Sequence, residues 1–380
     1  MSDMDTPLFH FGPTAQLLAL GALMAALPLA WVVWRFRGQG AHALVTRLTW
    51  LTLFLTFDLV LFGAFTRLSD SGLGCPDWPG CYGQATPVGA RDHIQAAQDL
   101  MPTGPVTHGK AWVEMVHRYL ASGVGGLILV LCLWAWRRRL KGDLQADAWG
   151  ATLTLVWVCV QGGFGALTVT MKLFPAIVTL HLMGGVLLLA LLARQAARQQ
   201  ALLRAPHLNP TAPGGRALRW TLGWGLALLL VQIALGGWVS TNYAVLVCDT
   251  FPRCQGSYWP EMAFDRGFEW WRPLGHNSWG ELLPFAALTA IHYTHRLAAY
   301  AVIPALLWVA WRLYRHPMPR LARALALLVL LQFLTGLSNV VLGWPMVAAV
   351  LHTGGAAAMV VVLVLAWQQT RSQPLTPTPA

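Results

Sequence analysis

The sequence predicts an all-α integral membrane protein, with two pseudo-repeated four-helix transmembrane bundles and one extra transmembrane helix at the N-terminus. Three observations predict this fold class. Of the 380 residues, 56% are hydrophobic and only 11% are charged, which is more apolar surface than one soluble core buries. Nine apolar stretches are long enough to cross a bilayer. One ordered set of cysteine, histidine and glutamine residues recurs in the second half of the chain.

The nine predicted spans are apolar runs of about 20 residues, enough for roughly 30 Å of hydrocarbon. The first run has the position of a signal peptide, but residues 1–14 hold two Asp and no Lys or Arg, and no clean cleavage site follows. We therefore expect a retained helix. The runs lie at residues 15–34, 48–66, 119–136, 148–171, 173–193, 220–240, 282–311, 324–343 and 346–368.

The net charge of +11 comes from basic residues that gather in alternate connections between the spans. This distribution indicates membrane topology rather than a nucleic-acid partner, because short basic connections stay in the cytoplasm. The N-terminus and the long loops 69–112 and 241–281 are then predicted outside, and the C-terminus in the cytoplasm. The four clusters are Arg35, Arg37 and Arg47; Arg137, Arg138, Arg139 and Lys141; Arg194, Arg198, Arg204, Arg216 and Arg219; and Arg312, Arg315, Arg320 and Arg323.

Two blocks of four spans carry the same markers in the same order, which predicts an internal duplication. The shared markers are a Cys pair with a five-residue gap, a His-Arg dipeptide, a Gln and, 20 residues after it, a His followed closely by two glycines. They lie at Cys75, Cys81, His117-Arg118, Gln161 and His181 in the first copy, and at Cys248, Cys254, His295-Arg296, Gln332 and His352 in the second.

The duplication sets the domain boundaries that we expect. Helical bundles place cofactors between facing helices, so each bundle is a candidate site. The predicted parts are the extra helix with a cytoplasmic connection (1–46), the first bundle with loop 69–112 (47–200), a cytoplasmic linker (201–219), the second bundle with loop 241–281 (220–370) and a cytoplasmic tail (371–380).

Two histidine pairs, His117 with His181 and His295 with His352, fall on the second and fourth helices of the predicted bundles. At a rise of 1.5 Å per residue, all four lie about 10 Å from the outer helix ends. Ionisable groups in a membrane are costly and usually functional, and neutral imidazole is an axial ligand of haem iron. Two pairs therefore predict two haem sites. Zinc is the alternative, but neither pair has thiolates or acids to complete a tetrahedral set.

The two copies differ three residues before the first histidine, where Glu114 stands in one and His292 in the other. A carboxylate one helical turn from an iron ligand can move protons or orient water, whereas an interfacial Glu can also simply cap or snorkel. Arg118 and Arg296 are candidate partners of haem propionates, with a role as interfacial anchors as the alternative. Asp58 in the second span has no evident partner, and we assign it no role.

Both Cys pairs lie in the predicted outer loops. An oxidising compartment favours disulfides, so we expect Cys75–Cys81 and Cys248–Cys254 bonds that close short loops. Redox-active thiol pairs are the alternative, and these would need access and a lowered thiol pKa.

Taken together, these residues resemble the haem A synthase family, whose members are assembly enzymes for haem-copper cytochrome oxidases. The resemblance covers residues 48–368, so the helix at 15–34 lies outside the eight-helix core of that family. It rests on the stretch Gly63–Cys81, Glu114-Met-Val-His117-Arg118, His181-Leu-Met-Gly-Gly, His295-Arg296 and His352.

The resemblance implies an oxidoreductase of the bacterial inner membrane that oxidises the C8 methyl group of haem O to a formyl group, giving haem A. It implies that His117 and His181 flank the haem O substrate, that Glu114 is the carboxylate of the oxidation, and that His295 and His352 are axial ligands of haem b. Candidate partners are then haem O synthase, cytochrome c oxidase assembly factors, membrane lipids and a second copy of the chain.

Two other functions use the same residues. A bis-histidine b-type cytochrome that only transfers electrons would need the four histidines, but it would give no reason for a Glu in one copy alone. A transporter is the other class, because repeated bundles also house substrate paths.

Overall fold

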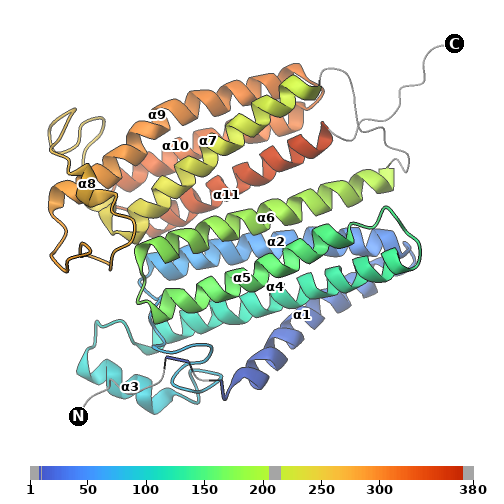
Figure 1. Cartoon of the computed structure of the whole chain (residues 1–380), viewed down its shortest axis with the longest axis horizontal. Coiled ribbons are helices and arrows are strands. Elements are labelled where there is room, and N and C mark those ends of the chain that lie inside the picture. Colours follow the sequence, from blue (N-terminus) through green and yellow to red (C-terminus); the bar gives the residue numbers. More distant parts are fainter. Residues whose placement is uncertain (1–7, 10, 205–214, 371–380) are drawn as a thin grey trace. The chain divides into compact units, whose positions relative to one another are not determined.

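The computed structural model describes residues 8–9, 11–204 and 215–370, and over them the chain is helical apart from turns and isolated bridges (Figure 1). Within this part, nine helices are long and apolar enough to cross a membrane, as predicted. They are α1 (Thr14–Phe36), α2 (Ala41–Leu68), α4 (His108–Leu140), α5 (Ala148–Thr170), α6 (Pro175–Arg204), α7 (Gly215–Thr241), α9 (Phe285–Arg315), α10 (Pro319–Val341) and α11 (Met346–Gln369).

Local sequence explains where several of these helices begin. The Thr107 side chain precedes α4 and accepts a hydrogen bond from the Lys110 N–H at 3.3 Å, and Asp147 does the same for Gly150 at the start of α5 at 3.1 Å. Such caps satisfy amide groups that have no partner inside the helix. Helix α10 begins with Pro319, whose fixed φ and missing N–H suit the first helical position.

The two long loops contain helices that apolar runs do not reveal. Helix α4 begins at His108, well before the apolar run at 119–136, because the polar residues of its first turns lower the local hydropathy. The candidate residues Glu114 and His117 therefore lie inside a helix. The first long loop (69–112) also holds α3 (Arg91–Leu100), and the second (241–281) holds η1 (Ala244–Leu246) and α8 (Phe264–Gly267).

The chain divides into two compact units, each of which is described by itself. Helices α2 and α6 contribute residues to both, so the boundaries expected from the duplication stay a prediction. The first unit comprises Met1–Arg35, Asp58–Gly185 and Glu269–Leu283, and the second comprises Phe36–Phe57, Val186–Phe268 and Pro284–Ala380.

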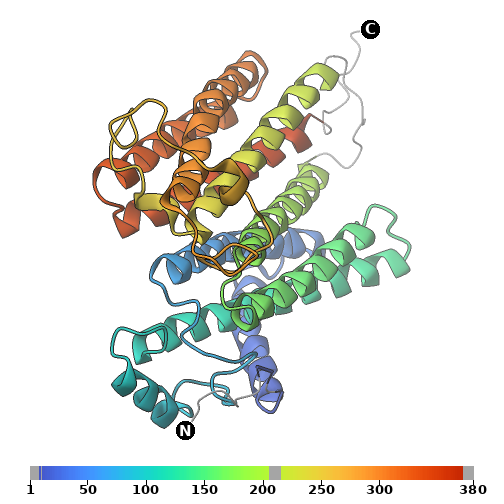
Figure 2. The same ribbon diagram turned by 60° about the vertical axis from the view of Figure 1, so that its left-hand side comes forward.

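The second unit contains a closed ring of four helices. Helix α7 packs against α9, α9 against α10, α10 against α11, and α11 against α7 (Figure 2). This is the arrangement of a four-helix bundle, and its interior is bounded by all four helices.

The first unit shows the same order of contacts. Helix α2 meets α4 where Gly63 lies against His117, and α4 packs against α5. Helix α5 meets α6 through the Trp157 indole N–H, which donates to the Gly184 carbonyl at 2.8 Å, and α6 returns to α2 where Gly185 faces Val60. The four helices α2, α4, α5 and α6 thus also enclose an interior.

The extra helix α1 packs on α4 through small residues. A Cβ on Gly21 would lie 2.8 Å from Cβ of Ser122, and a Cβ on Gly126 would lie 2.9 Å from Cβ of Ala25. Such small-residue contacts let membrane helices approach closely. Ahead of α1, the Trp78 N–H donates to the Leu8 carbonyl at 3.0 Å, which ties the start of the chain to the first long loop.

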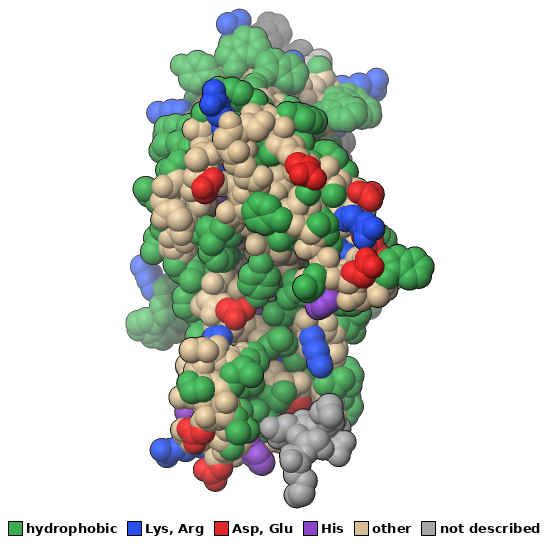
Figure 3. Space-filling model, turned by 90° about the vertical axis from the view of Figure 1, so that its left-hand side faces the viewer, with side chains coloured by type: hydrophobic (Ala, Val, Ile, Leu, Met, Phe, Trp, Pro, Cys, Tyr) green, Lys and Arg blue, Asp and Glu red, His purple; other side chains and the backbone are tan. Residues whose placement is uncertain are grey.

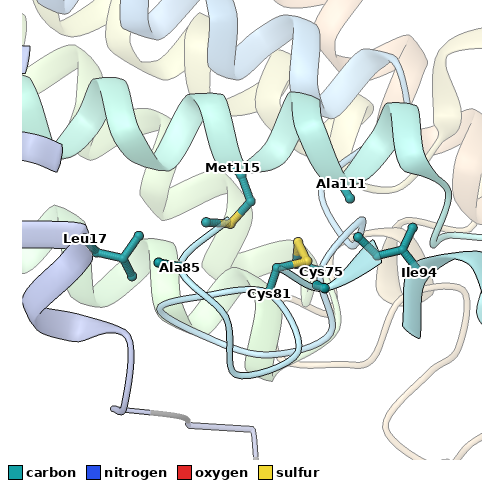
Figure 4. Packing of buried hydrophobic residues seen from close by; sticks show 8 residues of the cluster. Leu17, Cys75, Cys81, Ala85, Ile94, Ala111 and Met115 are labelled. Carbon is teal, nitrogen blue, oxygen red and sulfur yellow. A yellow bond between two sulfur atoms is a disulfide. The ribbon is translucent and has the colours of Figure 1, made fainter. Parts of the chain in front are cut away.

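Both predicted disulfides, Cys75–Cys81 and Cys248–Cys254, are present. The first is completely buried, and Figure 4 shows it among side chains from α1, α3, α4 and the loop itself. The residues packed with it are Leu17, Ala85, Ala90, Ile94, Ala111 and Met115.

The surface at the long loops mixes hydrophobic side chains with acidic and basic ones (Figure 3). Tryptophans of the second long loop, including Trp259, Trp270 and Trp279, are exposed. Exposed tryptophan among charges is typical of the boundary between a bilayer and water.

Candidate functional site

The first predicted pair, His117 on α4 and His181 on α6, lies inside the first unit. Glycines of the neighbouring helices leave room for the rings. A Cβ on Gly63 would lie 2.9 Å from Cε1 of His117, and one on Gly165 would lie 3.6 Å from Cε1 of His181. Phe62 stacks on His117, with ring centroids 6.2 Å apart and planes at 14°.

The second pair, His295 on α9 and His352 on α11, is brought together in the second unit. The ring centroids are 6.4 Å apart and the planes meet at 85°. Gly236 and Gly336 leave room for these rings, because a Cβ on either would lie 2.9 Å or 3.1 Å from the nearest Cε1. Imidazole binds a metal ion at about 2.0–2.1 Å, so two rings that share one ion have centroids roughly 6 Å apart. The separation of His295 and His352 is therefore the one expected of two imidazoles that would share one metal ion.

Polar side chains hold the two rings of the second pair at Nδ1. Thr335 Oγ1 lies 3.0 Å from Nδ1 of His352, and the Leu331 carbonyl, at 2.8 Å, is the nearest acceptor for its proton. With its proton on that carbonyl, the hydroxyl can accept from Nδ1–H, and in this tautomer Nε2 keeps its lone pair for a metal ion. Nε2 of the Gln232 carboxamide lies 3.1 Å from Nδ1 of His295 and donates to the His295 carbonyl at 3.0 Å. A metal ion on the other ring nitrogen of His295 puts the ring proton on Nδ1, and the carboxamide accepts this proton when it turns to present Oε1, which has no partner among the described residues.

The rings of the first pair have no such partners. Among the described residues, the buried Nδ1 atoms of His117 and His181 have no hydrogen-bond partner. The two pairs therefore share glycine neighbours but differ in what fixes the rings.

Glu114, which is 4% exposed, joins α4 to the first disulfide loop. Its carboxylate accepts from the Cys75 N–H at 2.8 Å and forms an ion pair with Arg118. Arg118 also donates to main-chain carbonyls of that loop, at 3.0 Å for Asp77 and 3.2 Å for Pro79. Glu114 is thus buried and hydrogen-bonded one helical turn before His117.

The matching residues of the second unit fasten the second disulfide loop without a carboxylate. Nδ1 of His292 lies 2.8 Å from the Ala244 carbonyl. Arg296 donates to the carbonyls of Thr250 at 2.9 Å and Arg253 at 3.0 Å. Both predicted propionate partners, Arg118 and Arg296, therefore bind their own long loops through Nη1.

The zinc alternative finds no support in the described part of the chain. Within residues 8–9, 11–204 and 215–370, no group of three or more His, Cys, Asp or Glu side chains converges as a metal site. Asp58, left without a role by the sequence, is exposed on α2.

Sequence reasoning missed Gln232, Thr335, Gly165 and Gly336. The signal for the glycines was present, because each has a glycine at the matching place of the other copy. Gln232 and Thr335 are polar residues inside apolar spans of one copy alone, and comparing the copies position by position would have found them.

A family model described as COX15-CtaA, cytochrome oxidase assembly protein, matches residues 46–364. The chain belongs to this family. The COX15-CtaA match begins after α1, so the extra helix lies outside it.

Curated relatives extend the likeness across most of the chain. The haem A synthase of Shewanella oneidensis is 38% identical over 84% of this chain and 95% of its own length. Those of Mesorhizobium japonicum and of a Chelativorans species are 28% and 29% identical, over 93% and 83% of this chain and 96% and 88% of their own lengths. This COX15-CtaA protein is therefore a multi-pass membrane protein that resembles haem A synthases over most of their length.

Proposed function

We propose that this protein is a haem A synthase, an oxidoreductase that converts haem O to haem A. The observation that carries the proposal is membership of the COX15-CtaA family together with 38% identity to a haem A synthase over 95% of that relative's length. The reaction turns the C8 methyl group into a formyl group. Two successive hydroxylations, each a two-electron oxidation of that carbon by an external oxidant that also supplies the oxygen atom, would give a geminal diol, which loses water to the formyl group.

In this proposal the second bundle holds haem b between His295 and His352. The centroid separation of 6.4 Å and the glycines beside both rings support it. Bound there, haem b would supply one-electron transfer. The protein's part is to fix the two imidazoles, and Gln232 and Thr335 do this at Nδ1.

The first bundle would hold the haem O substrate between His117 and His181. Glycines beside both rings and the closed ring of α2, α4, α5 and α6 support this assignment. Phe62 stacks on His117, and an aromatic side chain at that place helps to exclude water from an oxidation.

Glu114 would be the carboxylate that manages protons during the oxidation. Its burial and its position one turn before His117 support this role. Arg118 and Arg296 would meet the propionates of the two haems. Each guanidinium carries five N–H donors, so a propionate can be bound beside the loop carbonyls.

The proposed location is the bacterial inner membrane, with the N-terminus and both long loops outside and the C-terminus in the cytoplasm. The last turn of α4 holds Arg137, Arg138 and Arg139 and that of α9 holds Arg312 and Arg315, which supports cytoplasmic ends for these helices. Residues 371–380, the expected tail, lie outside the described residues. The proposed partners are haem O synthase, oxidase assembly factors, membrane lipids and a second copy of the chain.

The test is co-expression with a haem O synthase in a host without its own haem A synthase, followed by extraction and chromatography of the haems. We expect haem A with this protein and haem O alone with a His117→Ala control. A folded, haem-b-loaded protein that leaves haem O unconverted would identify an electron-transfer cytochrome instead. A purified folded protein without a Soret band would favour a transporter.

A further inference from the structure

The two histidine pairs lie in closely matched surroundings, which makes their one difference informative. Each of the four rings has a glycine at its Cε1 edge, on α2 and α5 in the first unit and on α7 and α10 in the second. Only the rings of the second unit have a polar side chain at Nδ1. In the described chain, Nδ1 of His117 and of His181 has no hydrogen-bond partner.

The glycines give the register for comparing the two units. Gln232 stands four residues before Gly236, and the residue four before Gly63 is Leu59. Thr335 stands directly before Gly336, and the residue directly before Gly165 is Phe164. Both Nδ1 partners of the second unit are therefore replaced by apolar side chains at the matching places of the first.

A hydrogen bond that Nδ1–H donates to an acceptor affects a histidine ligand in two ways. It fixes the tautomer and the rotation of the ring, and it raises the basicity of Nε2 toward the metal ion. Removing such a partner typically lowers metal affinity about 10- to 100-fold. A ring without a partner at Nδ1 is held by packing alone.

We infer that Gln232 and Thr335 are positioning residues that make His295 and His352 a permanent haem mount, whereas Leu59 and Phe164 leave His117 and His181 as an exchangeable one. This inference rests on the proposed function, because an enzyme that converts one haem must release it while it keeps another. The difference at Nδ1 lets two similar bundles keep one haem and release the other. The N-terminal pair holds its haem less tightly, and the product leaves.

The first experiment uses Thr335 in the full-length, haem-loaded protein. Thr335→Val keeps the shape and removes the hydroxyl, and Thr335→Ser is the matched control because it keeps the hydroxyl. We measure the rate of haem transfer to excess apomyoglobin and the midpoint potential of haem b. Thr335→Val should release haem b about 10- to 100-fold faster and shift its potential upward, since a less basic ligand stabilises ferric iron less. Thr335→Ser should stay near wild type.

Gln232→Leu, which installs the residue of the first unit, should act in the same direction on His295. Wild-type release rates and potentials in both Thr335→Val and Gln232→Leu would overturn the inference. Equal effects of Thr335→Val and Thr335→Ser would also overturn it, because the hydroxyl would then not be the cause.

The reciprocal experiment places partners in the first unit. Leu59→Gln combined with Phe164→Thr should retain haem on His117 and His181 through purification, raising bound haem toward two per chain, and should lower kcat with little change in KM. Unchanged haem content and kcat in a folded variant would count against the inference. Glu114→Gln, which leaves the Nδ1 atoms untouched, is the control for loss of turnover without added retention.

These measurements separate the inference from the proposed function. A wild-type protein that binds haem b but makes no haem A would refute the proposed function. The release rates of the Thr335 variants would still test whether Thr335 helps to retain haem b. A wild-type protein that makes haem A while Thr335→Val and Gln232→Leu retain haem b normally would refute the inference alone.

Discussion

The two bundles have the same order of helix contacts, yet they treat their histidines differently. In the second, Gln232 and Thr335 bind Nδ1 of His295 and His352. In the first, glycine and Phe62 pack against the rings, and the described residues offer no Nδ1 partner. The difference teaches that two bundles with the same helix contacts can be made different by a few side chains around their histidines rather than by the histidines themselves.

The two disulfide loops also differ in how they are bound to their helices. Both disulfide loops are fastened by an arginine that follows a histidine, Arg118 or Arg296. Only the first fastening includes a buried carboxylate, Glu114, where the second has His292 bound to a main-chain carbonyl. The carboxylate thus sits in the bundle whose histidines are less firmly held.

The largest expected effect comes from removing a ligand in either bundle. His352→Ala should abolish the haem b absorption, because the iron loses an axial ligand. His117→Ala should keep that absorption and abolish haem A formation. Reduced-minus-oxidised spectra and haem extraction measure the two effects. If His117→Ala removed haem b and His352→Ala left it, the two bundles would have the opposite assignment.

The second-largest effect is expected from replacing the carboxylate of Glu114. Glu114→Gln should lower haem A formation about 100-fold or more, because a carboxamide cannot exchange protons as a general acid or base does. It can still accept the Cys75 N–H bond, so the fold and the haem b spectrum should persist. His292→Gln is the matched change in the second bundle, and we expect haem A formation within a few-fold of wild type. Haem A output at the wild-type rate from Glu114→Gln would show that Glu114 is not the general acid or base of the reaction.

A smaller effect is expected where glycines make room for the rings. Gly63→Ala and Gly236→Ala each place a Cβ 2.9 Å from a histidine Cε1, so the ring must move. Overpacking of this kind costs about 1–3 kcal/mol. Gly63→Ala should lower haem A formation at normal haem b content, and Gly236→Ala should lower haem b content. Identical phenotypes for the two variants would show that the bundles are not functionally separate.

The smallest effect should come from the disulfides. Replacing Cys248 and Cys254 by Ser should lower the free energy of unfolding by about 2 kcal/mol, the loop-closure value for so short a loop. Replacing Cys75 and Cys81 should cost a similar amount and also lower haem A formation a few-fold, because the Cys75 N–H positions Glu114. Thermal unfolding in detergent and haem analysis measure both. Equal effects of the two double variants on haem A formation would contradict the link to Glu114.

Much of the fold could be predicted from the sequence because hydrophobic length is a local property. Nine apolar runs gave nine helices of transmembrane length among the described residues, and the position of the Cys pairs in the predicted outer loops predicted both disulfides. Helix α4 was predicted too short, because its first turns are polar and do not belong to an apolar run. The four histidines were found because they recur in order along the chain.

The sequence by itself determined which helices exist, which four histidines they carry and which cysteines pair, because apolar length and ordered spacing are written along one dimension. Only the tertiary structure decided that Thr335 on α10 reaches His352 on α11, that Gln232 on α7 reaches His295 on α9, and that Arg118 and Glu114 fasten the first disulfide loop. Those contacts depend on how each helix is rotated and shifted against its neighbour. Side-chain packing between helices sets that register, so it cannot be predicted from the sequence of one helix alone.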